Sequence, residues 1–129
     1  MCPENLAYTK EHEWVRVEGD QAIIGITDYA QDQLGDVVYV ELPEVGARLT
    51  QFETCGTIES VKTVADLYAP VSGEIMHIND ALDDTPELIN QDPYGTGWIA
   101  TIRMLNRDDL KNLLSAKDYE ALIRPSGGK

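Results

Sequence analysis

Short runs of aliphatic and β-branched residues, broken by glycine and proline, constrain the fold of this chain more than any other feature. Between residues 37 and 79 the turn residues recur at Gly46, Gly56, Pro70 and Gly73. Short strands at such spacing are typical of a β-sandwich or β-barrel. We therefore predict a mainly β fold.

The first part of the chain predicts a hairpin and a short helix. Residues 14–26 contain two strand-like runs on either side of the turn Gly19–Asp20, which indicates paired strands. Thr27 is suited to cap a helix near residues 28–34. A strong strand signal over residues 37–42 follows.

The second part is less regular. Residues 83–86 predict a loop, residues 86–89 a short helical turn, and residues 98–104 a strand. Leucines at helical spacing predict two short helices within residues 108–123, and residues 125–129 form a tail.

Two stretches resemble each other and lie on either side of Lys62. In residues 43–49 and in residues 70–75, a proline enters a turn, a glycine follows and an aliphatic residue comes next. A duplicated hairpin unit with twofold symmetry would produce this likeness, and so would the ordinary reuse of proline and glycine in turns.

Size and charge limit the class of protein. The chain has 129 residues, the size of one domain, and carries 23 Asp plus Glu against 10 Lys plus Arg, a net charge of −13. Nucleic acids and anionic membranes both attract basic proteins, so neither is an expected partner. We expect a single domain over residues 1–129, and a monomer.

Cysteines and apolar runs indicate the compartment. Cys2 lies at the terminus and Cys55 has no evident partner, so free thiols in a reducing compartment are expected. No apolar run approaches the ~20 residues that span a bilayer, and no signal or transit peptide is visible. We expect the cytoplasm of a bacterium, or the mitochondrial matrix only if a transit peptide has been removed.

Residue counts exclude most catalytic sites. His12 and His77 are the two histidines and lack zinc-binding spacing, so no metal site is expected. No nucleophile elbow or phosphate-binding loop occurs. The pair Asp83–Asp84 is unremarkable among so many acids. No catalytic residue is predicted.

Lys62 is the one side chain that invites a functional interpretation. It lies between two strand-like runs, at or beside the tip of a hairpin if these runs pair. By composition alone it is a solvated surface lysine, protonated and flexible.

The motifs around this lysine resemble a known family. Glu59–Thr63, with Gly56 before Lys62 and Gly73 after it, is similar to a lipoyl-attachment hairpin. Flanking segments in the same order resemble the glycine cleavage system H protein, and they are Glu11–Val15, Gly25–Asp36, Val40–Gly46, Leu88–Asn90 and Pro93–Trp98. The resemblance runs from about Leu6 to Leu122.

The resemblance implies a carrier without catalytic turnover of its own. The fold would be a lipoyl-domain-like flattened β-barrel or sandwich of two hairpin-repeat sheets, with an N-terminal extension and a C-terminal helical segment. Lipoic acid would form an amide with Lys62 and carry the aminomethyl group of glycine. The implied partners are a pyridoxal-phosphate glycine decarboxylase, a tetrahydrofolate-dependent aminomethyltransferase, the flavin enzyme dihydrolipoyl dehydrogenase, and lipoylating enzymes.

The resemblance also implies roles for single residues. Glu13 would face a water-excluding cleft and bind the aminomethyl ammonium, and Asp66 is a second candidate for that cleft. Some members of the family have histidine where this chain has Gln33, so any arm contact there would differ. Glu59 would be recognised by the lipoylating enzyme.

Gly56 and Gly73 are expected to serve the architecture of the hairpin, because glycine permits backbone approaches that side chains block.

Other functions remain open on the sequence alone. A biotinyl carrier uses the same kind of hairpin but has methionine on both sides of the lysine, where this chain has Val61 and Thr63. Lipoyl domains of 2-oxo acid dehydrogenases usually have aspartate before the lysine. A lipoyl-relay protein, which hands lipoyl groups to other enzymes, would look the same in sequence.

Overall fold

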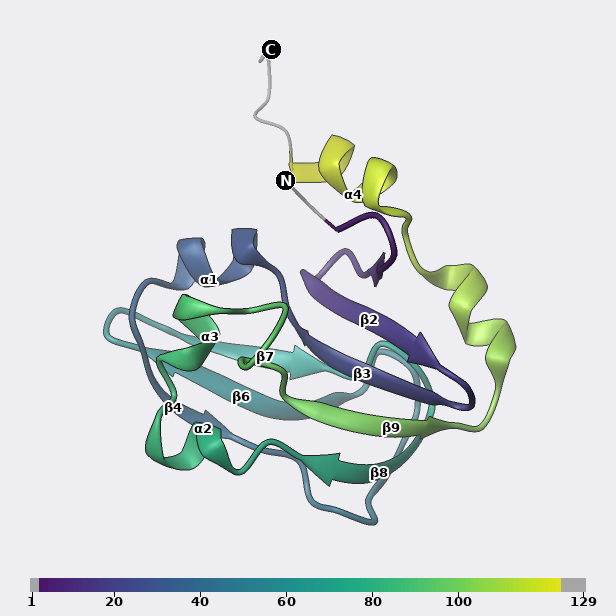
Figure 1. Ribbon diagram of the computed structural model, residues 1–129, viewed down its shortest axis with the longest axis horizontal. Helices are drawn as coiled ribbons and strands as arrows, with labels where there is room; N and C mark the ends of the chain where they lie inside the picture. The colour runs from purple at the N-terminus through teal and green to yellow at the C-terminus, as the bar shows by residue number, and fades with distance from the viewer. Residues whose placement is uncertain (1–2, 124–129) are drawn as a thin grey trace.

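Two antiparallel sheets make up the fold in the computed structural model, which describes residues 3–123 (Figure 1). The larger sheet has the strand order β1-β2-β3-β9-β8-β5, and the smaller has the order β4-β6-β7. The strands are β1 (Ala7–Tyr8), β2 (Glu13–Glu18), β3 (Gln21–Ile26), β4 (Val37–Glu41), β5 (Arg48–Leu49), β6 (Thr54–Ser60), β7 (Val64–Tyr68), β8 (Gly73–Ile78) and β9 (Ala100–Met104). The predicted mainly β architecture of two sheets is confirmed.

Five short helices connect or flank the sheets. They are α1 (Asp28–Leu34), α2 (Ala81–Asp84), α3 (Leu88–Gln91), the 3-10 helix η1 (Arg107–Asn112) and α4 (Ala116–Ile123). The expected pair of helices near the C-terminus is present, although the first of them is a 3-10 helix. The tail over residues 125–129 lies outside the described residues.

Three local predictions need correction. Residues 83 and 84, predicted as part of a loop over residues 83–86, are instead the last two residues of α2. Helix α3 starts at Leu88, two residues after Pro86, where the helical turn was predicted to begin. Strand β9 starts at Ala100 rather than at Trp98, whose carbonyl accepts a hydrogen bond from the Asn79 side chain. These shifts are of the one or two residues by which element boundaries commonly vary.

Helix α1 begins and ends where its sequence predicts. The Thr27 hydroxyl accepts a hydrogen bond from the Ala30 N–H at 3.1 Å, which satisfies one of the unpaired donors of the first turn. Gly35 follows the helix with φ of 81° and donates its N–H to the Gln31 carbonyl. A side chain at that φ would be strained, so glycine ends the helix here.

The main core lies between the two sheets. Side chains from both sheets are almost completely buried there, including Ile24, Ile58, Leu67, Ile75 and Ile102. A second buried cluster forms where α4 meets the N-terminal strands, and it contains Leu6, Tyr8, Trp14, Ala116 and Tyr119. The C-terminal helix is therefore packed against the start of the chain.

The two similar stretches of sequence lie side by side. Strand β5 pairs antiparallel with β8, and Arg48 faces Glu74. Just before β5, the Gly46 N–H donates to the Ile75 carbonyl at 2.8 Å, and Ile75 donates back to Ala47 at 2.9 Å. Two similar segments that pair antiparallel are related by a local twofold axis, which favours the duplicated hairpin unit.

None of the helices within residues 3–123 has the length and apolar character needed to cross a membrane.

Gly73 lies where two backbones approach closely. A Cβ atom at this position would lie 2.1 Å from the Arg103 carbonyl oxygen and 2.6 Å from Cγ2 of Ile102. Both neighbours belong to β9, which is paired on its other side with β3. The backbone therefore has little room to move away from a larger residue.

We expect the substitution Gly73→Ala to lower the free energy of unfolding by about 2–3 kcal/mol, because it overpacks the contact with β9. Urea unfolding measures this change. Gly19→Asn is the control, because Gly19 has φ of 64° with open space around it, and asparagine tolerates that conformation. Equal losses in the two variants would contradict the prediction.

Candidate functional site

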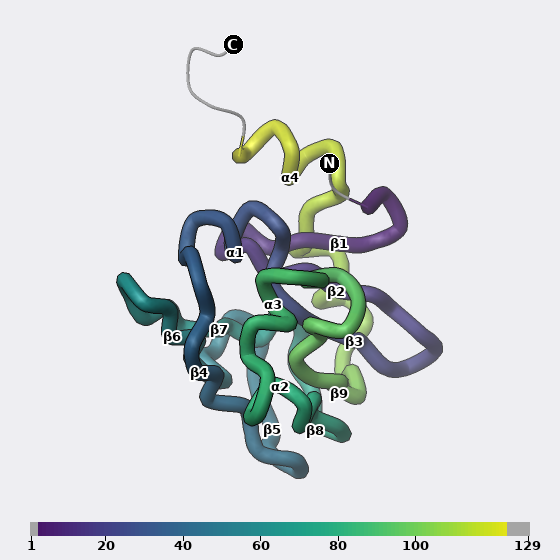
Figure 2. The backbone as a smooth tube through the Cα atoms, turned by 60° about the vertical axis from the view of Figure 1, so that its left-hand side comes forward, coloured from purple at the N-terminus to yellow at the C-terminus, as the bar shows by residue number. Residues whose placement is uncertain are grey.

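Lys62 lies at the tip of the β6–β7 hairpin, which projects from the body of the protein in Figure 2. Neither Val61 nor Lys62 has a positive φ, so this is not the usual tight hairpin turn. The Ser60 hydroxyl accepts the N–H groups of Lys62 at 3.3 Å and Thr63 at 3.1 Å. The Val61 N–H donates to the Asp36 carbonyl at 3.0 Å. All three N–H groups of the tip thus have acceptors.

The Lys62 side chain is exposed and its stem lies against the end of α1. A Cβ atom built on Gly35 would lie 3.5 Å from Cε of Lys62 and 3.9 Å from its Cδ. The lysine therefore leaves the hairpin on the side of α1.

A cleft of about 260 Å³ opens beside α1, and its lining includes Leu34, the residue before Gly35. Its lining residues come from the loop before β2, from the start of β2, the end of β3, α1 and the hairpin. They are Glu11, His12, Glu13, Ile26, Ala30, Gln33, Leu34, Ile58, Ala65, Asp66 and Tyr68. Asp66 is four residues from Lys62, at most ~13 Å along a strand. A lysine stem with a lipoyl chain, about 14 Å long from bond lengths, can reach into this cleft.

Glu13 is the buried carboxyl group of the cleft, with 1% of its surface exposed. One carboxyl oxygen accepts a hydrogen bond from the Thr9 hydroxyl, and the other accepts from the Tyr68 N–H at 3.1 Å. Burial disfavours the charged form and raises the pKa of Glu13 from 4.5 to about 7, although the two hydrogen bonds act against this shift. The carboxyl group is therefore poised to gain or lose a proton near neutral pH.

His12 also lines the cleft, although no role was predicted for it. It has φ of 74°, and its Nδ1 lies 2.7 Å from the Tyr119 hydroxyl. Burial lowers the pKa of His12, which favours the neutral imidazole. His12 lies in the family-like segment Glu11–Val15, but its contact with Tyr119 of α4, which is distant in the chain, carries no sequence signal of its own.

The structure brings three of the candidate residues together and separates the others from them. Glu13, Asp66 and Gln33 all line the cleft, and of these only Glu13 is buried. Gly56 lies on β6 where a Cβ atom would be 2.4 Å from the Glu41 carbonyl oxygen. Gly73 belongs to the other sheet and touches neither Lys62 nor the cleft lining.

Glu59 lies on the outer face of the smaller sheet, in a cross-strand row with Tyr39 and Val64. All three side chains are exposed, and Val64 shows 60% of its surface. Val61 at the tip is exposed as well, at 69%. The acidic Glu59 is thus surrounded by solvent-facing apolar side chains next to Lys62.

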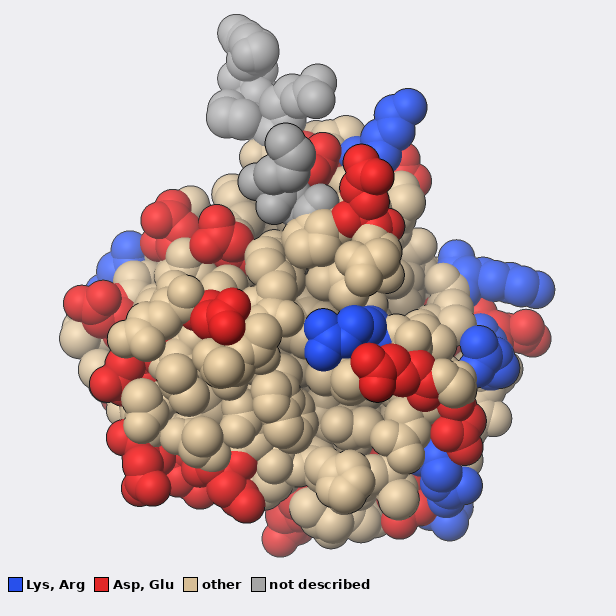
Figure 3. All heavy atoms as spheres, viewed as in Figure 1, with Lys and Arg blue, Asp and Glu red and all other residues tan. Residues whose placement is uncertain are grey.

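Charge is distributed unevenly over the molecule. Figure 3 shows acidic side chains over α1 and the hairpin on the left, and most of the basic side chains of this face on the right. Between Arg16 and Arg103 the sequence holds only two basic residues, Arg48 and Lys62. Lys62 therefore lies on a mainly acidic part of the surface.

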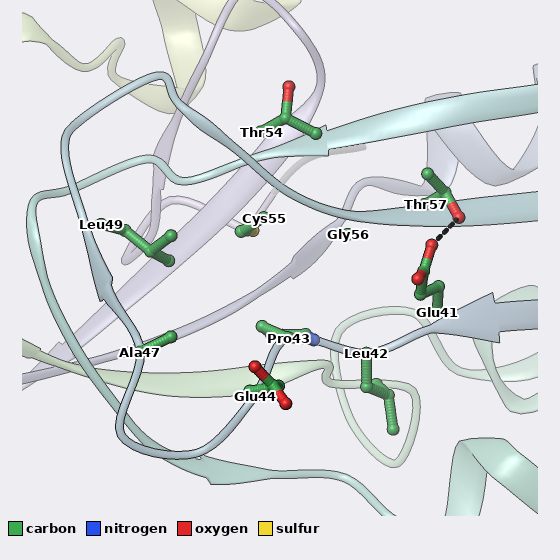
Figure 4. Close-up of a pocket in the computed structure, with 10 residues that line it drawn as sticks. All are labelled: Glu41, Leu42, Pro43, Glu44, Ala47, Leu49, Thr54, Cys55, Gly56 and Thr57. Carbon is green, nitrogen blue, oxygen red and sulfur yellow. Dashed lines mark hydrogen bonds between the residues drawn. The ribbon is translucent and has the colours of Figure 1, made fainter.

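A second hollow, of about 480 Å³, lies between β4, β5 and the start of β6 (Figure 4). Cys55 faces it, and burial raises the pKa of the thiol to about 12, which keeps it protonated and a poor nucleophile. Gly56 in its wall is six residues from Lys62, on the order of 20 Å along the strand. This hollow is beyond the reach of an arm on Lys62.

The protein offers no alternative centre for metal chemistry in residues 3–123, where no group of three or more His, Cys, Asp or Glu side chains could hold a metal ion. Cys55 is a free thiol, and Cys2 lies outside the described residues.

Comparison with known proteins identifies the family. The family described as "Glycine cleavage H-protein" matches residues 6–126. The chain belongs to this glycine cleavage H-protein family. The family is the lipoyl-carrying component of the glycine cleavage system, and the chain is such a carrier.

Individual relatives agree with this assignment. The glycine cleavage system H protein of Symbiobacterium thermophilum is 58% identical over 122 residues, which cover 95% of each chain. That of Geobacillus kaustophilus is 55% identical over 121 residues, 94% of this chain and 95% of the relative. The crystal structure of the H protein from Mycobacterium marinum superposes with a TM-score of 0.84 at 41% identity, covering 93% of this chain and 97% of the other.

The buried Glu13 makes stability depend on pH. An unfolded glutamate ionises near pH 4.5 and the folded one near pH 7, so the folded state binds more protons in between. Stability therefore falls as the pH rises through this window, by roughly 3 kcal/mol in total. Glu13→Gln removes this ionisation. We therefore expect the free energy of unfolding of the variant to rise relative to that of the unchanged protein as the pH increases from 4 to 8.

Urea unfolding at several pH values measures the difference, and carbon NMR of the Glu13 carboxyl group gives its titration directly. A difference between the two proteins that does not change with pH, together with an NMR midpoint near 4.5, would show that burial does not govern this group.

Proposed function

We propose that Lys62 carries lipoic acid through an amide bond, and that Glu13 receives the cargo end of the arm in the cleft. We also propose that the chain is a single domain without catalytic turnover of its own. The observation that carries this proposal is the direction of Lys62: its stem leans on Gly35, beside a cleft with one buried carboxyl group.

The residues present suit the lipoyl group. An amine at an exposed hairpin tip is accessible to an enzyme that must enclose it. Ile26, Leu34 and Ile58 supply an apolar wall to the cleft. A charged lysine would lose hydration on entering such a wall, whereas an amide-linked arm carries no charge and enters at lower cost. When bound, the lipoyl group supplies a sulfur that carries the aminomethyl cargo from one enzyme to the next.

Glu13 is suited to hold the ammonium end of that cargo. A cation beside a carboxyl group favours the ionised form and lowers its pKa. Since the Glu13 pKa is about 7 in the unliganded cleft, arrival of the ammonium would shift it to the carboxylate. An arm seated in the cleft would keep water from its cargo, and in water a carbon bonded to both nitrogen and sulfur loses ammonia.

Asp66 is a second, weaker contributor. It lies on β7 at the cleft, but its side chain is exposed. An exposed carboxylate attracts an ammonium group through solvent and loses most of this effect to screening by salt. We propose that Asp66 lies at the mouth of the cleft and Glu13 at its inner end. Gln33, on the α1 side, supplies a polar but uncharged contact.

Glu59 is proposed as a contact for the lipoylating enzyme. Its exposed position beside Tyr39 and Val64 supports this role, because an acidic group within an apolar surround can fix the register of a docking partner. Gly56 and Gly73 are proposed to hold the sheet geometry that presents the hairpin.

The proposed partners are those of the glycine cleavage system. They are a pyridoxal-phosphate glycine decarboxylase, a tetrahydrofolate-dependent aminomethyltransferase, dihydrolipoyl dehydrogenase with its flavin, and a lipoylating enzyme. A monomer with one acidic end can visit each of these in turn. The relatives from Symbiobacterium thermophilum and Geobacillus kaustophilus are bacterial, so we propose the bacterial cytoplasm as the site of action.

Intact mass measurement tests the attachment. We expect protein purified from lipoate-supplied cells to carry one lipoyl-sized adduct, and the Lys62→Ala variant to carry none. Lys111→Ala is the control, because Lys111 is an exposed lysine on η1, and it should keep the adduct. Unmodified protein from lipoate-supplied cells would disprove attachment at Lys62.

Decay of the cargo tests the role of Glu13. We expect Glu13→Ala to become lipoylated normally but to shorten the lifetime of the aminomethyl cargo roughly tenfold, since a hydrogen bond to a charged group is lost. Ammonia release after loading measures the lifetime. The matched control is Glu11→Ala, which changes an exposed acid of the same cleft. The same lifetime in both variants would rule out the proposed contact.

A further inference from the structure

Asn90 on α3 makes three hydrogen bonds to the segment that joins α1 to β4. Its Nδ2 donates to Oε1 of Gln31 and to the Gly35 carbonyl, and its Oδ1 accepts the Val37 N–H, each at 2.9 Å. The side chain thus reaches the last turn of α1, the residue after the helix and the first residue of β4.

The segment that Asn90 holds is also the one that supports the hairpin tip. The Asp36 carbonyl, between Gly35 and Val37, accepts the Val61 N–H at 3.0 Å. Gly35 itself lies against the Lys62 stem, with its Cβ position 3.5 Å from Cε. Gly35, which contacts the Lys62 stem, is therefore bonded by Asn90. Asp36, which accepts the Val61 N–H, lies between two residues that Asn90 bonds.

We propose that Asn90 is a positioning residue for Lys62, acting through Gly35 and Asp36 on the tip of the lipoyl hairpin. This inference rests on the proposed function of Lys62 and deepens it. A lysine held in one orientation reaches the active site of a lipoylating enzyme more often than one on a loose tip, because ordering the tip is no longer part of binding.

The chemistry of asparagine fits this place, and that of aspartate does not. Asn90 offers two donors to two acceptors, the Gln31 side chain and the Gly35 carbonyl, and one acceptor to a donor. An ionised aspartate has no donor, so it would set a negative charge against both oxygens. Asn90→Asp keeps the volume of the side chain and removes the two bonds.

Asn79 provides a matched control. It also makes three hydrogen bonds, donating to the carbonyls of Thr96 at 2.8 Å and Trp98 at 2.7 Å and accepting from the Ala81 N–H at 3.3 Å. Its three partners differ from those of Asn90, and none of them is hydrogen-bonded to Val61, Lys62 or Thr63 at the tip. Asn79→Ala therefore changes stability without touching the support of Lys62.

The first measurement is hydrogen exchange of the Val61 amide in unmodified protein. We expect both Asn90→Ala and Asn90→Asp to accelerate this exchange about tenfold, relative to the amides of the main core, and Asn79→Ala to leave it unchanged. The second measurement is enzymatic lipoylation, in which the Asn90 variants should raise KM several-fold with little change in kcat.

Two results would overturn the inference. One is unchanged Val61 exchange in both Asn90 variants, and the other is equal acceleration in Asn79→Ala. Exchange is read without any lipoyl group, so it is independent of whether Lys62 is the attachment site. If Lys62 were never lipoylated, the mass measurement would fail while the exchange result would still report on Asn90.

Discussion

The hydrogen bond from the Tyr68 N–H to the Glu13 carboxyl group joins the two sheets at the edge where the cleft opens. Glu13 begins β2 of the larger sheet, and Tyr68 ends β7 of the smaller one. Because β7 is an edge strand, its N–H would otherwise need another partner. The same carboxyl group therefore closes the sandwich and provides the polar end of the site, which links the stability of the fold to the chemistry of the cleft.

The C-terminal helix α4 also holds the loop before Glu13 in place. The Tyr119 hydroxyl lies 2.7 Å from Nδ1 of His12 and 2.7 Å from the hydroxyl of Thr27, which caps α1. One side chain of α4 thus contacts both the loop that presents Glu13 and the helix that forms the cleft wall. The left-handed backbone at His12 is tolerated because these surroundings hold it in place.

The parts of the fold that depend on neighbouring residues could be predicted from the sequence. Thr27 and Gly35 set the bounds of α1, and the turn at Gly19–Asp20 set the first hairpin, because caps and turns act within a few residues. The boundaries of α2 and β9 could not be predicted in this way. There Asn79 bonds the carbonyls of Thr96 and Trp98, and the contact spans about twenty residues of sequence.

The residues of the candidate site also differ in whether the neighbouring sequence was enough to predict them. Lys62 and Glu59 were predicted as site residues because the short motif around them resembles a lipoyl hairpin, and Glu13 because the wider resemblance pointed to it. Alternation along β2 would have placed Glu13 and Trp14 on opposite faces, one of them in solvent, but both are buried. The start of the strand is covered on both sides by segments distant in sequence, including Tyr119 and β7. His12 and Asn90 lie in segments that carry the resemblance, but their contacts join parts distant in the chain, so no role could be assigned to them from the sequence.

Charge would give the proposed site its selectivity for an ammonium cargo. The chain has 23 acidic residues, yet among those described Glu13 alone combines near-complete burial with a pKa raised to about 7. Amide formation at Lys62 would remove a cation from the acidic end of the molecule and leave the arm neutral. The ammonium of the cargo would then be the positive charge nearest to Glu13 within the cleft. A carboxyl group that ionises when a cation arrives holds that cation more firmly than it holds water, so under the proposed function the loaded arm would favour the cleft and the empty arm would not.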